Sequence, residues 1–130
     1  MFTVQMRRVV EQDNSYRWYE LSGNEIENSH FTLEIRNGRI GQGTKSRQLH
    51  FASHEGLESE TLRRIRKRLQ NGYQFKNIRA SDGLQDKIEG LNIDDAVGKN
   101  AENAYMAYNL LCALQPILKD SFEDPQLDYA

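Results

Sequence analysis

The sequence has few of the features that would suggest a secreted or membrane protein. A single cysteine, Cys112, excludes an intrachain disulfide. No apolar run approaches the length of a bilayer span, and the charged, alternating stretch of residues 1–14 does not resemble a signal peptide. We therefore expect a protein of the reducing cytoplasm that has no membrane partner.

Residues suited to catalysis or metal binding are also scarce. The three histidines are His30, His50 and His54, and the last two flank an expected strand-to-helix junction next to Glu55. Such histidines are more typical of surface or capping positions than of a metal site. No Ser/His/Asp grouping is present, and the carboxylates of residues 120–128 indicate a solvated tail. The sequence thus predicts no catalytic residue, no metal site and no cofactor.

Charge is divided unevenly along the chain. The formal net charge of −2 combines +5 over residues 1–79 with −7 over residues 80–130. Residues 36–79 alone hold 11 basic and 3 acidic side chains. This asymmetry is compatible with solvated faces and also with an anion-binding surface, for example for nucleic acid. The change in composition predicts a domain over residues 1–79 and an acidic, mainly helical extension over residues 80–130.

Hydrophobic periodicity predicts an α+β domain in the basic part: a small antiparallel sheet with one packed helix. Strands are expected at 1–10, 16–22, 30–36, 46–53 and 72–78, with a loop, SGNEIENS, after the second. The helix should begin after Ser53 as N-cap, run to about Gln70, and end at Asn71-Gly72. Its expected apolar face comprises Leu57, Thr61, Leu62, Ile65 and Leu69.

A second helix is predicted in the acidic extension, near residues 94–115, ending at or soon after Pro116. Its apolar residues form two stripes on different sides, which is typical of a helix buried between two bodies. One body would be the sheet domain and the other a second protomer, so a homodimer is one hypothesis. Cys112 lies on one stripe and is expected to be buried and structural. Another hypothesis is that the extension folds back onto the basic face.

Three glycines stand among basic residues in IRNGRIGQGTKSRQLHF, residues 35–51. A phosphate-binding P-loop is excluded, because Thr44 adds one residue before Lys45 and a strand, not a helix, is expected to follow. From the residues alone, the favoured interpretation is a hairpin with a type I′ turn at Asn37-Gly38. Gly41 and Gly43 would then mark a bulge or loop.

Four landmarks in residues 1–79 resemble the WGR domain, a small module of poly(ADP-ribose) polymerases and of short bacterial proteins. They are RWYEL at 17–21, RNGRIG at 36–41, FAS at 51–53 and RRIRKRLQNGY at 63–73, in the family's order and spacing. The resemblance implies that the sheet continues through the signature, which argues against a reversal at Asn37-Gly38. It also implies a binding module, because the polymerases' catalytic activity resides in a separate domain.

The signature departs from the family at one position, since Asn37 stands where the family has tryptophan. In the polymerases this element lies against a DNA end and the tryptophan stacks on a sugar, which asparagine cannot do. A phosphate contact by the motif's arginine remains compatible with the sequence. The motif residues here are Asn37, Gly38, Arg39, Ile40 and Gly41.

The favoured hypothesis is a non-enzymatic module that contacts nucleic acid, DNA rather than RNA, through backbone phosphates. The expected contact residues are Arg36, Arg39, Lys45, Arg47, Arg63, Arg66 and Lys67. The alternative is a protein–protein interaction or assembly module, a homodimer or adaptor, that does not bind nucleic acid. The doubly apolar helix and the missing tryptophan favour this alternative, and the basic side chains would then only solubilise the surface, with Glu60 paired to Arg64.

Overall fold

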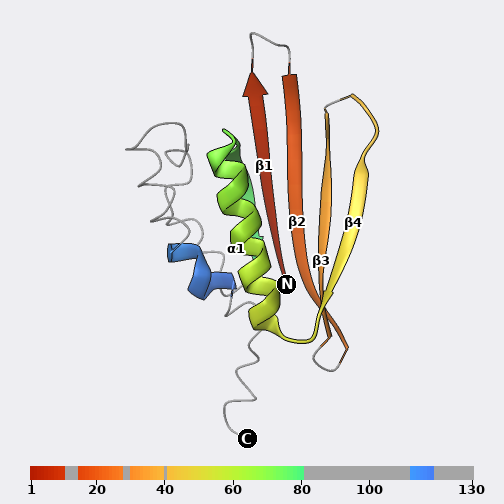
Figure 1. The fold of residues 1–130 in the computed structure, drawn as a ribbon, viewed down its shortest axis with the longest axis vertical. Helices are drawn as coiled ribbons and strands as arrows, with labels where there is room; N and C mark the ends of the chain where they lie inside the picture. Colours follow the sequence, from red (N-terminus) through yellow and green to blue (C-terminus); the bar gives the residue numbers. More distant parts are fainter. Residues whose placement is uncertain (11–14, 28–29, 40, 81–111, 119–130) are drawn as a thin grey trace, which may run out of the picture.

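The computed structural model describes residues 1–10, 15–27, 30–39, 41–80 and 112–118, and it has the expected α+β fold (Figure 1). The elements are β1 (Phe2–Val10), β2 (Ser15–Glu27), β3 (His30–Arg39), β4 (Lys45–Phe51), α1 (His54–Gln70) and β5 (Gln74–Ala80). The first four strands form an antiparallel meander. The chain then crosses one face of the sheet as α1, and β5 pairs with β1, giving the order β4-β3-β2-β1-β5.

The core lies between α1 and the face of the sheet that it covers. Strand alternation sends every second side chain to this face, and the helix contributes Leu57, Thr61, Ile65 and Leu69, all buried as expected. Glu58 is also buried, with 7% of its surface exposed, and its carboxylate lies 3.2 Å from Nδ1 of His54. The polar residue on the apolar face is therefore paired with a neighbouring side chain.

Both ends of α1 carry the capping interactions that the sequence predicts. The hydroxyl of Ser53 accepts the N–H of Gly56 at 3.2 Å. At the other end the N–H of Tyr73 donates to the carbonyl of Arg68 at 2.9 Å, and that of Gly72 donates to the carbonyl of Leu69 at 3.1 Å. These two bonds form a Schellman motif around Gly72, whose φ of 88° lies in the left-handed region.

Replacing Gly72 with alanine is expected to lower the free energy of unfolding by about 1 to 2 kcal/mol, because a Cβ is disfavoured at this positive φ. Chemical denaturation of the two proteins measures the difference. Gly56→Ala is an unsuitable control, since a Cβ there would lie 3.3 Å from the Phe51 ring. Gln70→Ala in the same turn is exposed and should change stability by less than about 0.5 kcal/mol. Equal effects of the two substitutions would contradict the backbone explanation.

Strands β2 and β3 are longer than the predicted ranges, which were 16–22 and 30–36. The predicted loop SGNEIENS is wrong for residues 22–27, because β2 continues to Glu27 and pairs with β3 through Asn24↔Thr32 and Glu25↔Phe31. Gly23 serves packing rather than a turn, since a Cβ there would lie 2.4 Å from the ring of Phe2. Pairing with a neighbouring strand therefore overrides the turn propensity of this polar segment.

The described part of the C-terminal extension is a helical segment, residues 112–118, that packs against the domain (Figure 1). Leu114, Ile117 and Leu118 are buried within the same hydrophobic core as the sheet and α1. The expectation that Cys112 is buried is wrong, because it is exposed on the other side of this segment. Residues 94–111 of the helix predicted near 94–115 lie outside the described residues. Within the part of the chain that the structure describes, no helix is long and apolar enough to cross a membrane.

Candidate functional site

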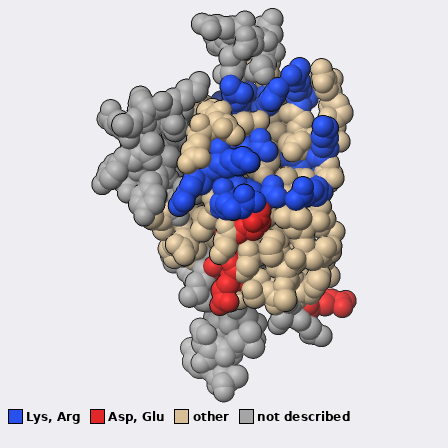
Figure 2. All heavy atoms as spheres, in the orientation of Figure 1, with Lys and Arg blue, Asp and Glu red and all other residues tan. Residues whose placement is uncertain are grey.

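The basic side chains converge where β3 and β4 extend beyond the cover of α1. Alternation along β3 points Ile35, Asn37 and Arg39 to the helix side of the sheet. On β4 the partners of Ile35 and Asn37 are Arg47 and Lys45, so these two cations face the same side. Figure 2 shows that Lys and Arg side chains gather over this part of the molecule.

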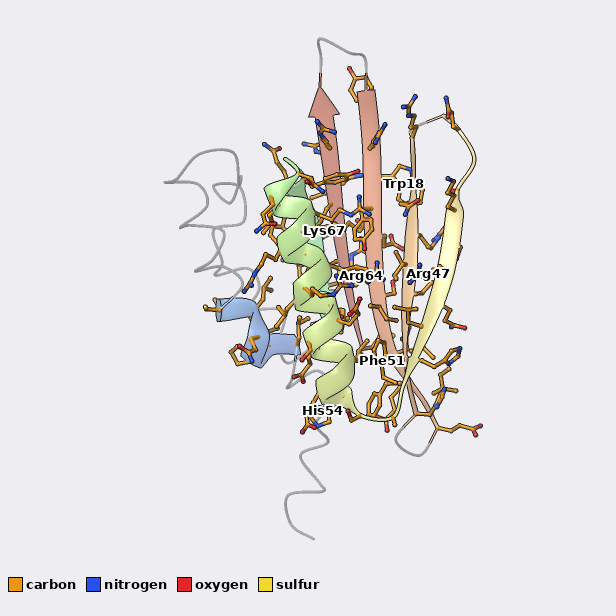
Figure 3. All side chains as sticks on the ribbon, viewed as in Figure 1. Trp18, Arg47, Phe51, His54, Arg64 and Lys67 are labelled. Carbon is orange, nitrogen blue, oxygen red and sulfur yellow. The ribbon has the colours of Figure 1, made fainter. Side chains whose placement is uncertain are left out.

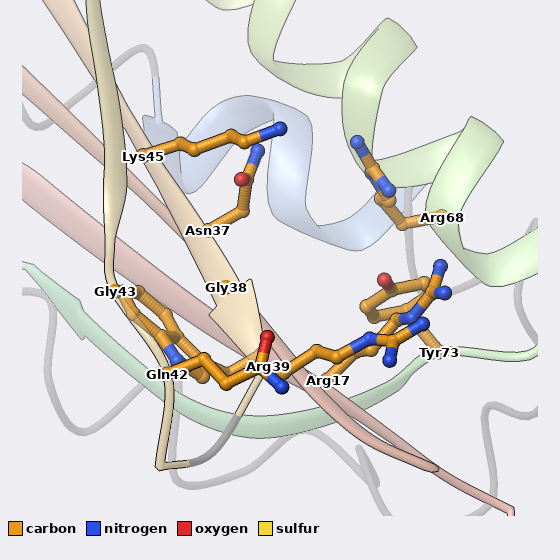
Figure 4. A pocket seen from close by; sticks show the side chains of 10 residues that line it. Arg17, Asn37, Gly38, Arg39, Gln42, Gly43, Lys45, Arg68 and Tyr73 are labelled. Atoms are coloured by element: carbon orange, nitrogen blue, oxygen red, sulfur yellow. The ribbon is translucent and has the colours of Figure 1, made fainter.

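A pocket of about 350 Å³ lies at this end of the sheet, and we call it the arginine pocket. Figure 4 shows the side chains of Arg17, Arg39, Lys45 and Arg68 around it, coming from β2, β3, β4 and α1. The described residues that line it are Arg17, Trp18, Asn37, Gly38, Arg39, Gln42, Gly43, Lys45, Arg68 and Tyr73. These residues include four cations and no carboxylate, so the pocket is suited to an anion.

A second pocket, of about 540 Å³, adjoins the first and runs between β4 and α1. It is lined by Ile35, Asn37, Lys45, Ser46, Arg47, Arg64 and Arg68. Asn37, Lys45 and Arg68 belong to both pockets, so together they form one continuous surface, which we call the basic groove. Figure 3 shows Arg47 on the sheet side and Arg64 on the helix side.

The cations of the basic groove differ in how firmly they are held. The guanidinium of Arg68 stacks over two rings, 4.1 Å from the centroid of Tyr19 and 5.3 Å from that of Tyr73. Arg64 donates to Glu60 at 2.9 Å and to the hydroxyl of Tyr19 at 3.4 Å. These contacts pre-organise the helix side of the groove, because both guanidinium groups are fixed to buried or half-buried partners.

Most of the positive charge in the groove is not neutralised by the described part of the chain. Among described residues, no carboxylate oxygen lies within 4.0 Å of Arg17, Arg39, Lys45, Arg47 or Arg68. Glu60, which partners Arg64, also accepts from Arg63, and this hydrogen bond is the largest cause of the lowered pKa of its carboxyl. Glu60 therefore stays ionised and offsets the charge of the helix, while the strand cations remain available to a ligand.

The structure brings together three of the seven residues expected to contact nucleic acid, namely Arg39, Lys45 and Arg47. Arg36 lies on the opposite face of the sheet, because it is three positions from Arg39 and successive residues of a strand face opposite sides. There its guanidinium lies 3.6 Å from Glu20 and 3.8 Å from Glu34, and 5.9 Å from the ring centroid of Trp18. Its grouping with the other cations is therefore wrong.

The remaining expected residues lie on the outer surface of α1. Arg63 pairs with Glu60 and its side chain is 60% exposed. Arg66 and Lys67 are exposed and line neither pocket of the groove, although Lys67 is one residue from Arg68 (Figure 3). These three residues could meet only a ligand that extends beyond the groove.

Sequence reasoning missed three cations that line the groove: Arg17, Arg64 and Arg68. The four-residue spacing of Arg64 and Arg68 places them on one flank of α1, and this spacing is visible in the sequence. Arg17 has no such signal, because its position depends on pairing directly opposite Arg39.

The signature segment is part of the sheet. The prediction of a type I′ turn at Asn37-Gly38 is wrong, because Asn37 pairs with Tyr19 on one side and Lys45 on the other. The reversal comes later: Gln42 donates its N–H to the carbonyl of Arg39 at 3.0 Å, and Gly41 has a φ of 86°. Ile40, the fourth residue of the motif, lies outside the described residues.

Gly38 is closely packed on both sides. A Cβ there would lie 3.1 Å from the carbonyl oxygen of Gly43 and 3.3 Å from Nε1 of Trp18. The indole of Trp18 thus lies against the glycine of the signature, and Gly38 pairs directly with Trp18 in the sheet. The glycine allows the strand, the indole and the following loop to meet closely, and both Trp18 and Gly38 are among the residues that line the arginine pocket.

The histidines lie away from this groove. His30 and His50 are 3.0 Å apart between Nε2 and Nδ1, and His54 pairs with Glu58. Within the described ranges, no group of three or more His, Cys, Asp or Glu side chains could hold a metal ion.

Comparison with known proteins adds one finding to this geometry. The family model of the WGR domain matches residues 2–79, which span β1 to β5 and both sides of the basic groove. Comparison with curated proteins and with solved structures gave no match. The matched residues cover more than half of the chain and include the signature, the two capped ends of α1 and the sheet. The chain therefore belongs to the WGR domain family.

Proposed function

We propose that this chain is a non-enzymatic module that binds nucleic acid, with DNA as the preferred partner, through backbone phosphates in the basic groove. The observation that carries the proposal is that the described residues lining the groove include six cations and no acidic residue. Phosphate contacts by Lys and Arg supply most non-specific affinity for DNA. Membership of a family of binding modules supports the same proposal.

The groove is not suited to reading bases by stacking. Its two aromatic rings are engaged within the chain: Tyr73 is buried beneath Arg68, and Trp18 lies against Gly38. Phosphate contacts alone carry no sequence information. The proposed binding is therefore independent of base sequence, and Asn37 lies in the groove as a small polar side chain without a stacking surface.

Titration of a short fluorescent duplex by anisotropy at several salt concentrations tests the proposal. If five groove cations contact phosphates, the slope of log K against log salt is expected to be about −4 to −5, with a dissociation constant of roughly 10⁻⁴ to 10⁻⁶ M at physiological salt. Blunt, nicked and single-stranded DNA and a matched RNA complete the series. Absence of duplex binding at low salt, or affinity that is independent of salt, would rule the proposal out.

The assembly hypothesis rests on the helix near residues 94–115, most of which lies outside the described residues. At its described end Leu114 packs into the core of the same chain, as do Ile117 and Leu118 just beyond it, and these three are not available to a second protomer. Sedimentation at several concentrations separates the two functions. A concentration-independent dimer that does not shift DNA would favour assembly over nucleic-acid binding.

A further inference from the structure

Three arginines lie side by side at the end of the sheet that α1 leaves uncovered. Arg8 on β1 pairs directly with Arg17 on β2, and Arg17 pairs directly with Arg39 on β3. Directly opposite residues on antiparallel strands have Cα atoms about 4.5 to 5.5 Å apart, and like charges in such pairs are destabilising. We call these residues the arginine row. Its repulsion is a cost to the fold unless an anion offsets it.

The arginine row also contains donors that have no partner in the part of the chain that the structure describes. The Nε atoms of Arg8 and Arg17 are buried and have no hydrogen-bond partner among the described residues. A buried donor without an acceptor is uncommon in folded proteins, and an unseen ion is one of its ordinary explanations. The repulsion between neighbours favours an anion at this place, and the unpartnered Nε atoms are a separate observation that an unseen ion would explain.

The arginine pocket lies at one end of this row and sets the size of the ligand. Arg17 and Arg39 of the row line it, and Arg68 and Lys45 contribute two more cations from other elements (Figure 4). Its volume of about 350 Å³ is near the lower end of the usual range for small-molecule sites. A nucleic-acid backbone brings one charge per nucleotide to this cluster, whereas linked phosphates bring several charges within the same length.

We propose that the arginine row, with Arg68 and Lys45, is a subsite for linked phosphates of the di- or triphosphate type. Such a chain carries several charges within a short length, and each guanidinium can bind two of its oxygens with a planar pair of N–H groups. The proposal rests on the proposed function, because the subsite forms one end of the same basic groove. The ligand class that the subsite adds, a chain of linked phosphates, needs neither base pairing nor a helical backbone to bind in the pocket.

Calorimetry with inorganic tripolyphosphate, at an ionic strength held constant with sodium chloride, tests the subsite in the full chain. We expect one site per chain and an affinity at least about tenfold higher than for orthophosphate, since more charge-assisted hydrogen bonds form. A nucleoside triphosphate is the second source of the same chemistry. If the nucleoside triphosphate binds with the same affinity as tripolyphosphate, the phosphate chain is the recognised group. If it binds more tightly, the nucleoside makes additional contacts. Both results support the subsite.

Substitutions that keep the charge separate a built site from general attraction. Arg17→Lys and Arg8→Lys remove the orphan Nε donors but leave the net charge unchanged, and each should weaken tripolyphosphate binding by about tenfold. Arg66→Lys, on an exposed position of α1 outside the pocket, is the matched control and should bind like the wild type. A cooperative thermal unfolding transition, measured without ligand, is the check that each variant is folded.

The results for tripolyphosphate and for duplex DNA are distinguishable. Wild-type protein that binds duplex but not tripolyphosphate overturns the subsite and leaves the proposed function standing. Several weak sites per chain, or binding unaffected by Arg17→Lys and Arg8→Lys, also overturn it, because attraction to net charge alone would explain both. Binding of tripolyphosphate without duplex binding would instead support the subsite and remove the proposed function.

Discussion

Reversing the charge at two positions of β4, with Lys45→Glu and Arg47→Glu in one protein, is expected to weaken duplex binding by about a hundredfold at physiological salt. Each lost phosphate contact should also lower the magnitude of the salt slope by about 1. Both side chains are exposed, both face the groove, and neither lies within 4.0 Å of a carboxylate in the described residues. The loss should therefore come from binding and not from unfolding.

The control for this experiment changes net charge equally at positions outside the groove. Lys76→Glu and Arg79→Glu together replace two exposed cations of β5, the edge strand at the other side of the sheet from β4, that line neither pocket of the groove. Their effect on affinity should stay within about threefold, since a screened charge far from the contact changes little beyond a Debye length of about 8 Å. Equal losses in the two double variants would show that only net charge matters, and the groove would no longer explain binding.

Truncating two leucines of the C-terminal helical segment is expected to have the largest effect on stability. Leu114→Ala and Leu118→Ala should each lower the free energy of unfolding by about 2 to 5 kcal/mol, because each removes a fully buried side chain and leaves a cavity. The family match ends at residue 79, so these leucines lie outside the matched region while packing into its core. Urea denaturation of the full chain, followed by circular dichroism, measures the change.

A neighbouring residue in the same segment provides the control. Cys112 is exposed, and Cys112→Ala should alter stability by less than about 0.5 kcal/mol. If the leucine variants behave like Cys112→Ala, the segment does not contribute to the core in solution. A large loss in the leucine variants alone would establish that residues beyond the family match are needed for the stability of the domain.

The fold was largely predictable because its main signals are local. The capping residues of α1 and its apolar face are set by neighbours in the sequence, and both are confirmed in the structure. The turn at Asn37-Gly38 was predicted wrongly because strand pairing, not local propensity, decides the conformation there. These two residues have strong turn propensity, but pairing with β2 and β4 on both sides holds them in a strand. Only the family resemblance pointed to this outcome.

The site was predictable only in part, because it is assembled from four elements whose register the sequence does not specify. The grouping of Arg36 with Arg39 was an avoidable error, since residues three apart on one strand face opposite sides. The inclusion of Arg17 depends on its pairing with Arg39, and that of Arg68 on the placement of α1 over the sheet. Neither relation leaves a periodic signal in the sequence.

The packing of Trp18 against Gly38 has a practical consequence. Trp18 is the chain's single tryptophan, and its indole forms part of the arginine pocket. Its fluorescence emission therefore comes from one place in the molecule, beside the bound anion's expected position. Occupancy of the pocket should change the intensity or wavelength of that emission, so unlabelled protein can report binding in an ordinary fluorimeter.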